Sequence, residues 1–363
     1  MKKTLIIFLA LIFLTASFLP AQTADADQAY IKAMTATTPA EKARLLKDYL
    51  AAYGGKGSQY ENFANANICL TAYPGKTDKE TIDYGEKALA LGGLDDLTKC
   101  QILIVVSGTF SKIGQNLEKS KAYGLQVVEI ARSNKSKESD TSTAAQWNQL
   151  MGGGYYAAGQ AQEKTKDYKG AADSYLNSFN ILKNPQILTN LKKLGKSLYD
   201  AKAYADSEKV LKAVYAATKD YEITVLYAKS IYKLGRNGES LTYFKEAYNK
   251  QKSGELAYNI GIILAKDAQS NPTLAGEAIK YLLEASMLYP SQSQQAMQMA
   301  ESLFFLSNKD LKYNETVTQI QGINKKIEEI TKAYNEKFGG KEEDELSDND
   351  KKEMKTMLDS IEA

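Results

Sequence analysis

Side chains that could carry out chemistry are few in this sequence, and histidine is missing altogether. Histidine is the usual general base near neutral pH and the usual nitrogen ligand of zinc, so its absence removes Ser-His and Cys-His arrangements and the common zinc sites. The two cysteines, Cys69 and Cys100, fall on expected helices. They could form a disulfide in an oxidising compartment or stay as two buried free thiols. Neither arrangement implies catalysis.

Two short strings resemble the end of a phosphate-binding loop: Gly75-Lys76-Thr77 and Gly195-Lys196-Ser197. Such a loop needs a glycine five positions before the first residue of the string and a preceding strand. Leu70 and Asn190 occupy those positions, and both strings lie among helical patterns. The acidic run at 347–350 lacks the glycine and the final glutamate of a calcium loop. We therefore predict no catalytic, cofactor-binding or metal-binding residue, and no enzymatic activity.

The elements that would position any functional side chain follow a repeating pattern. Small residues at Gly159, Gly195, Ala228 and Gly261 lie in the middle of helical patterns, at spacings of 36, 33 and 33 residues. Each is followed by a second small residue, 12 positions later in three units and 17 in the last, and then by a large residue four positions on. These pairs are Ala171 and Tyr175, Ser207 and Leu211, Ser240 and Phe244, and Ala278 and Leu282. The longer gap predicts a five-residue insertion around 269–274.

These four units resemble tetratricopeptide repeats, whose unit of about 34 residues is a helix–turn–helix. The resemblance covers 150–290 firmly and 57–130 loosely, where Tyr84-Gly85 recurs as Tyr123-Gly124. Two residues depart from the pattern: Gln162 stands where the family has a large residue, and Val214 stands where it has a small one. The resemblance implies an all-α fold: an α-α superhelix, or solenoid, of stacked helix-turn-helix repeats with a concave face.

The ends of the chain differ in composition from the repeats. A basic start and an apolar stretch of about 15 residues predict a cleaved signal peptide, because a spanning helix needs roughly 20 residues; an uncleaved anchor is the alternative. Isoleucines at steps of three and four along 316–338 predict a long C-terminal capping helix, with a coiled-coil seam as the alternative. The polar segment 132–143 is either a linker or a long turn. The expected organisation is 1–26 signal peptide, 27–131 diverged helical hairpins, 132–143 linker, 144–290 clear repeats, 291–340 capping helices and 341–363 charged tail.

In tetratricopeptide solenoids the first helix of each repeat lines the concave groove. The resemblance therefore implies a groove formed by exposed side chains of these helices, mostly tyrosine and lysine. We predict that the partner-binding residues are Tyr156, Gln160, Lys192, Lys196, Tyr199, Lys229, Tyr232, Tyr258 and Lys266. Tyrosine rings supply contact area at a low cost in entropy, and ammonium groups pair with carboxylates, so this composition suits a peptide.

The expected function is a non-enzymatic scaffold or adaptor of the cell envelope that binds a protein or peptide partner in this groove, without a cofactor. A net charge of +2 gives no reason to expect nucleic acid, whose phosphates need a surplus of cations. The signal peptide predicts a periplasmic or secreted protein, which could associate with the outer membrane, and the mature chain has no integral membrane segment. The alternatives are a glycan- or small-molecule-binding module and a cell-wall enzyme that uses carboxylates.

Overall fold

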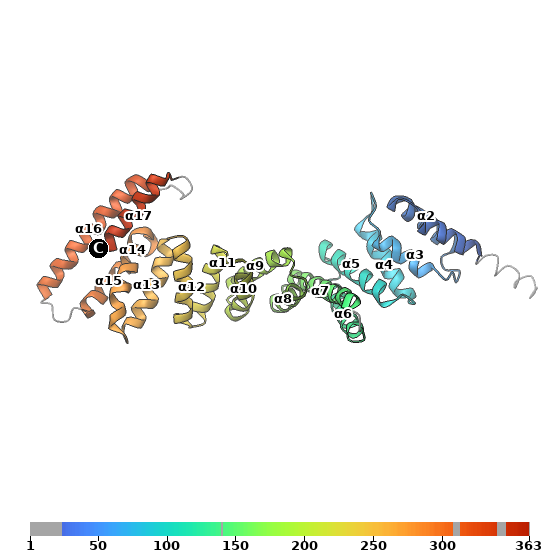
Figure 1. The fold of residues 1–363 in the computed structure, drawn as a ribbon, viewed down its shortest axis with the longest axis horizontal. Helices are drawn as coiled ribbons and strands as arrows, with labels where there is room; N and C mark the ends of the chain where they lie inside the picture. Colours follow the sequence, from blue (N-terminus) through green and yellow to red (C-terminus); the bar gives the residue numbers. More distant parts are fainter. Residues whose placement is uncertain (1–23, 139–140, 308–312, 340–345, 363) are drawn as a thin grey trace, which may run out of the picture. The chain divides into compact units, whose positions relative to one another are not determined.

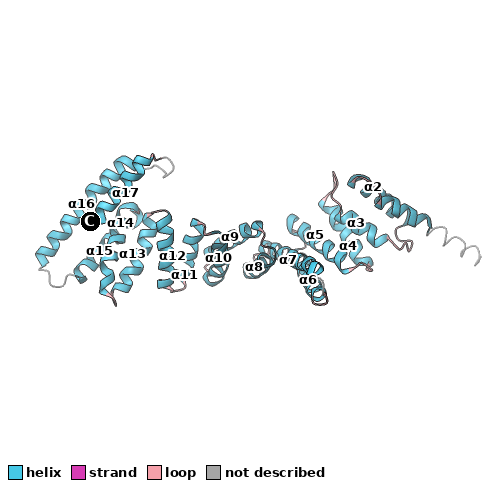
Figure 2. Cartoon of the chain, in the orientation of Figure 1, coloured by secondary structure: helices cyan, strands magenta, loops and turns pink. Residues whose placement is uncertain are grey.

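The computed structural model describes residues 24–138, 141–307, 313–339 and 346–362. All regular elements in these ranges are helices, joined by loops and turns (Figures 1 and 2), which confirms the all-α class. The chain divides into two compact units, residues 1–194 (unit 1) and residues 195–363 (unit 2). The division falls inside helix α9 (Pro185–Asp200). The predicted signal peptide lies outside the described residues except for its last three positions, which begin a helix over 24–34.

Unit 1 is a series of helical hairpins in which each helix also packs against the next hairpin. After the helix over 24–34, its helices are α2 (Pro39–Tyr53), α3 (Glu61–Leu70), α4 (Asp78–Leu91), α5 (Asp96–Ile113), α6 (Leu117–Lys135), α7 (Thr141–Lys164) and α8 (Tyr168–Leu182). No helix in the described part of the chain is long and apolar enough to cross a membrane.

The helix starts in unit 1 are set by local sequence signals. The Thr38 side chain accepts a hydrogen bond from the Glu41 backbone N–H, and Pro39 is the first residue of α2. Thr77 and Glu80 form a reciprocal capping box at the start of α4. Such caps satisfy backbone donors that have no partner inside the helix, so they fix where α2 and α4 begin.

The two phosphate-loop-like strings have structural roles instead. The Lys76 ammonium donates to the carbonyls of Cys69, at 2.5 Å, and Thr71, at 3.0 Å, at the end of α3. Burial lowers the pKa of this lysine. The string that begins at Gly195 lies within α9, where its glycine packs against the next helix of the hairpin. A lysine that caps a helix end is not available to hold a phosphate.

Helices α6 and α7 cross at two glycines. A Cβ on Gly124 would lie 2.6 Å from the Ala158 nitrogen and 2.7 Å from the Gly154 oxygen, and a Cβ on Gly154 would lie 2.7 Å from the Gly124 oxygen. The backbones therefore touch directly. The segment 132–143, expected to be a linker or a long turn, includes the end of α6 and the start of α7; the two units divide between Leu194 and Gly195.

Unit 2 contains further hairpins and ends in three packed helices, of which α16 is the longest. Its elements after α9 are α10 (Tyr204–Thr218), α11 (Tyr221–Lys233), α12 (Asn237–Lys250), α13 (Gly254–Ala268), η1 (Pro272–Leu274), α14 (Ala275–Leu288), η2 (Pro290–Gln292), α15 (Ser293–Ser307), α16 (Tyr313–Phe338) and α17 (Asp348–Glu362). The short 3₁₀ helix η1 occupies the insertion predicted at 269–274.

The repeating small residues serve the packing role that their spacing predicts. A Cβ on Gly195 would lie 2.7 Å from the Leu211 side chain, and one on Gly261 would lie 2.8 Å from Leu282. In unit 1, a Cβ on Gly159 would lie 2.8 Å from the Tyr175 ring. All three large residues are fully buried. A glycine inside a helix costs about 1 kcal/mol relative to alanine, and here the close approach of a bulky partner offsets that cost.

The C-terminal helices pack against the last repeat. Helix α16 contacts α14 and buries Ile320 and Ile327, as expected of a capping helix. Residues 348–362 were expected to belong to a charged, solvated tail, but they form α17, which contacts α14 and α16. Glu353 of α17 forms an ion pair with Lys337, and the Tyr334 hydroxyl of α16 donates to the Met354 sulfur at 3.7 Å.

The second helices of neighbouring hairpins are joined by phenols and ammonium groups that donate to glutamates about one repeat away. These pairs are Lys47 with Glu80, Lys119 and Tyr123 with Glu86, Tyr215 with Glu246, Lys245 with Glu277, and Tyr248 with Glu284. We call this set the glutamate ladder. Because each rung joins nearest neighbours only, the ladder adds to the local stacking on which repeat proteins depend.

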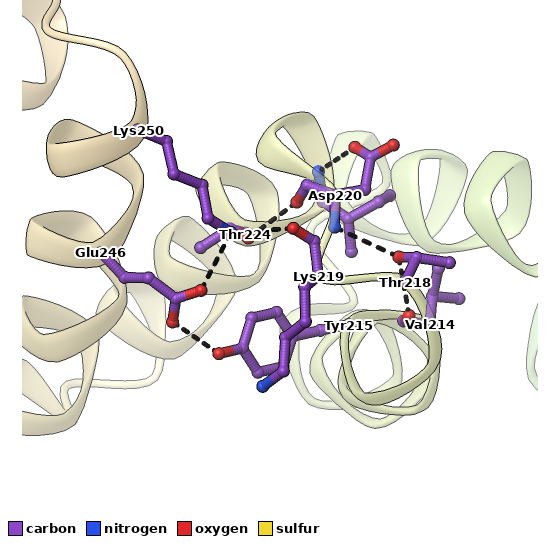
Figure 3. A network of polar contacts seen from close by, with 9 residues as sticks. Val214, Tyr215, Thr218, Lys219, Asp220, Thr224, Glu246 and Lys250 are labelled. Carbon is purple, nitrogen blue, oxygen red and sulfur yellow. Dashed lines mark hydrogen bonds and ion pairs between the residues drawn. The ribbon is translucent and has the colours of Figure 1, made fainter.

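One rung is tied to the turn between α10 and α11 (Figure 3). Glu246 accepts from the Tyr215 hydroxyl and, at 3.0 Å, from the Lys250 ammonium, which also donates to the Lys219 carbonyl at 2.8 Å. That carbonyl lies at the left-handed residue that ends α10. The Lys219 ammonium lies 3.7 Å from the centre of the Tyr215 ring. Although burial works against it, these hydrogen bonds hold the pKa of Glu246 below its ordinary value.

Both cysteines are buried free thiols. Cys69 packs with Val106 and Phe110, whereas Cys100 packs with Leu103 and other residues of a separate cluster. Burial raises the pKa of each thiol to about 11. Of the two arrangements that the sequence leaves open, the structure therefore has the free thiols.

Candidate functional site

The predicted groove residues fall into both units. Tyr156, Gln160 and Lys192 belong to unit 1, and the other six belong to unit 2. Since the division lies on α9 between Lys192 and Lys196, each group is described by itself.

In unit 1, Tyr156 is held by two neighbours. Its ring packs against Tyr175 with centroids 5.7 Å apart, and its hydroxyl accepts a hydrogen bond of 3.2 Å from the Asn190 amide. Gln160 lies one turn further along α7, and Lys192 lies on α9 beside Asn190; both are half-buried. Tyr175 itself is buried and donates to Glu163, and both effects raise the pKa of its phenol.

In unit 2, three successive first helices each carry a charged residue followed three positions later by a tyrosine. The pairs are Lys196 and Tyr199 on α9, Lys229 and Tyr232 on α11, and Glu255 and Tyr258 on α13. Residues three apart share one face of a helix, so each pair presents a charge and a ring together. We call Tyr199, Lys229, Tyr232, Glu255 and Tyr258 the first-helix cluster.

An ion pair joins two helices within the first-helix cluster. The Lys229 ammonium lies 2.6 Å from a Glu255 carboxylate oxygen, with 27% of the lysine side chain and 46% of the glutamate side chain exposed. Tyr199 is near enough to respond to the carboxylate: burial first, then Tyr204 and Glu255, raise the pKa of its phenol. A partly exposed ion pair of this kind contributes about 0–1 kcal/mol to the stability of the fold. Little stability is therefore lost when either group leaves the pair to contact a charge of a binding partner.

The tyrosines of the first-helix cluster are packed rather than freely rotating. The ring of Tyr232 meets Phe244 edge-on at 6.5 Å, and that of Tyr258 meets Tyr289 at 6.1 Å. Burial, followed by Tyr232 and Tyr289, raises the pKa of the Tyr258 phenol, and Tyr232 and Tyr258 both pack against the same buried cluster of unit 2. All three tyrosines of the cluster are half-buried, so each presents a supported ring edge to the surface.

Two predicted residues of unit 2 lie apart from this cluster. The Lys196 ammonium pairs with Asp200 on its own helix at 2.7 Å, and both side chains are more than half exposed. Lys266 is exposed in the last turn of α13, two turns beyond Tyr258. The structure therefore brings Tyr199, Lys229, Tyr232 and Tyr258 together and leaves these two lysines at the margin.

Sequence reasoning missed Asn190, Glu255 and Tyr289. Asn190 follows Tyr156 by 34 residues, one repeat length, and that spacing could have suggested the contact. Glu255 occupies on α13 the same place before a tyrosine that Lys229 occupies on α11. Tyr289 precedes Pro290 at the end of the last repeat, where the predicted roles were purely structural.

The first-helix cluster offers rings, one ammonium and one carboxylate. Within the described ranges, no group of three His, Cys, Asp or Glu side chains is placed to hold a metal ion. The arrangement is suited to recognition by contact area and charge pairing.

The helical hairpins and the glycine contacts define the chain as an all-α protein of repeated, stacked helix–turn–helix units. Neither a family model nor a curated protein matches its sequence. Among the matching solved structures is the crystal structure of a tetratricopeptide repeat protein from Parabacteroides merdae ATCC 43184. It is 12% identical, with a TM-score of 0.36 over 77% of this chain and 99% of that chain. The assignment to this class rests on the repeats of the chain itself.

Proposed function

We propose that this protein binds a segment of a partner protein on the first-helix cluster and acts as a non-enzymatic scaffold or adaptor of the cell envelope. The observation that carries the proposal is the partly exposed Lys229–Glu255 ion pair between α11 and α13, on helices whose half-buried Tyr232 and Tyr258 pack against the same buried cluster. Supported tyrosine rings lose little entropy on binding, and the partly exposed pair can exchange for charges of a partner.

Charge reversal at one residue tests the binding site. Lys229→Glu should reduce the capture of the partner from an envelope extract about tenfold or more, because it repels a partner carboxylate and also breaks the internal pair. Lys212→Glu is the matched control, since it makes the same change at an exposed position on α10, a second helix that carries no residue of the cluster. Equal capture by the two variants would refute this site.

A charge swap separates folding from recognition. Lys229→Glu combined with Glu255→Lys restores an ion pair of reversed direction, so the thermal stability should return to that of the natural protein. Partner capture should remain reduced, because the two charges are now presented in exchanged positions. Recovery of capture together with stability would show that the pair only supports the fold.

The envelope location rests on the basic, apolar and small-residue pattern of residues 1–26. Export of the full chain in a bacterial host should yield a periplasmic protein whose N-terminal sequence begins near position 27. Recovery of the intact N-terminus in the cytosol would refute the envelope role while leaving the binding site untouched.

A further inference from the structure

Unit 2 contains a cleft formed by α15 and α16 together with the end of α14. It is an open cleft of about 680 Å³. Its lining is rich in polar side chains that end in amides or carboxylates: Gln294, Gln298, Glu301, Glu328 and Asn335. The first-helix cluster lies on α9, α11 and α13, so this cleft belongs to different elements.

The lining chemistry matches that of a peptide backbone. A side-chain amide has both donors and an acceptor, as a peptide group does, and can pair with an extended chain. Gln294 and Gln298 are one helical turn apart and both are exposed, so their amides lie along the same side of α15. Met297 and Ile327 add apolar surface between the polar groups.

The length of the cleft sets the size of an occupant. On α15 the lining extends from Ser293 to Glu301, and on α16 from Ile327 to Asn335. Each stretch corresponds to a rise of about 12 Å along its helix. An extended chain advances about 3.3–3.6 Å per residue, so roughly four residues fit along this length.

The charged side chains that line the cleft favour a basic peptide over an acidic one. Two carboxylates, Glu301 and Glu328, line the cleft with a single ammonium, Lys332. Glu336, one turn along α16, lies 3.9 Å from that ammonium. The carboxylates therefore dominate the field in the cleft, and a cationic segment is attracted where an anionic one is repelled.

We propose that this cleft is a second binding site, which takes a short extended segment of a basic polypeptide. Backbone groups of the segment pair with the amides, and its lysine or arginine side chains pair with Glu328 and Glu301. The site would let one protein hold two different segments, one at each set of elements.

Fluorescence anisotropy with a blocked, dye-labelled octapeptide of alternating serine and lysine tests the proposal. We expect the full-length protein to bind this probe and not the analogue with glutamate in place of lysine. Glu328→Lys should weaken binding about tenfold, which is about 1.4 kcal/mol, because it replaces an attraction for the lysine side chains of the probe by a repulsion. Glu329→Lys is the matched control: it has the same charge change on the next residue, which is exposed and does not line the cleft. It should change the affinity less than about twofold.

A second variant, Gln294→Ala combined with Gln298→Ala, tests the other wall without changing charge, and should also weaken binding. Equal effects of the variants at positions 328 and 329 would overturn the site, because they would indicate diffuse attraction. Equal binding of the glutamate peptide, or no binding of the lysine peptide up to about 1 mM, would overturn it as well. Lys229→Glu should leave this affinity unchanged, so the two binding sites can fail independently.

Discussion

The crossing of α6 and α7 predicts opposite effects of the same substitution at two glycines. Gly124→Ala places a methyl group 2.6 Å from the Ala158 nitrogen and 2.7 Å from the Gly154 oxygen. These are backbone atoms, which cannot rotate away as the end of a side chain can. Gly108→Ala, on α5, places the methyl group where no atom lies within 4 Å.

The expected magnitudes follow from two opposing effects. Alanine gains up to about 1 kcal/mol over glycine inside a helix, and this is the whole effect at Gly108. Overpacking costs about 1–3 kcal/mol, and a contact with rigid backbone lies at the upper end or beyond it. We therefore expect Gly124→Ala to destabilise unit 1 by about 2 kcal/mol and Gly108→Ala to stabilise it by about 0.5–1 kcal/mol. For a unit of this size, each kcal/mol moves the unfolding temperature by about 2–4 °C.

The single tryptophan makes the measurement specific. Trp147 is 8% exposed and packs with Val127 and Ala131 beside the crossing, so its fluorescence reports on unit 1 alone. Thermal and urea unfolding of the two variants, followed by this fluorescence, should shift in opposite directions from the natural protein. An unfolding midpoint for Gly124→Ala at or above that of the natural protein would refute the direct backbone contact.

Two further predictions concern titratable groups. Because hydrogen bonds lower the pKa of Glu246 in the folded state, its contribution is present above its ordinary value of 4.5 and is lost as the pH falls through the folded-state pKa. Glu246→Gln should thus lower the free energy of unfolding by about 1 kcal/mol at pH 7, and the difference should shrink as the pH falls below 4.5. Urea titrations in which the difference stays constant with pH would contradict this. Burial raises the pKa of Cys69 and Cys100 to about 11, so the native protein should react with a disulfide reagent at pH 8 many times more slowly than the unfolded chain. Rapid modification of both thiols in the folded protein would disprove that burial.

Much of the fold could be predicted because it depends on local signals and on one repeated contact. The caps at Thr38 and Thr77 follow from short sequence patterns, and the packing of Gly195 and Gly261 follows from a spacing. The crossing at Gly124 could not be predicted, because its partner Gly154 lies in a glycine run whose rotation about the helix axis the sequence does not fix.

The candidate site was only partly predictable for a related reason. Helical periodicity places Tyr199, Lys229, Tyr232 and Tyr258 on first helices, and they do lie together. Periodicity says nothing about which charge a lysine meets on the next helix. The pairing of Lys229 with Glu255 depends on how far α13 is shifted along its axis relative to α11, which the sequence does not specify. Lys196 instead forms an ion pair with Asp200 on its own helix.

In unit 2 every rung of the glutamate ladder runs from donors on one second helix to a glutamate on the next, whereas in unit 1 Glu86 of α4 accepts from Lys119 and Tyr123 of the following second helix. Helix α12 accepts from the preceding second helix through Glu246 and donates to the following one through Lys245 and Tyr248. A duplicated hairpin would carry both kinds of contact and could join the stack without a new interface. A chain cut before α12 would leave Glu246 without its donor Tyr215. A cut after α12 would leave the donors Lys245 and Tyr248 without their glutamates. Duplication of a hairpin therefore preserves the contacts between second helices, whereas deletion of part of the stack breaks them. Truncated forms of the protein should end at a position where no rung of the glutamate ladder is broken.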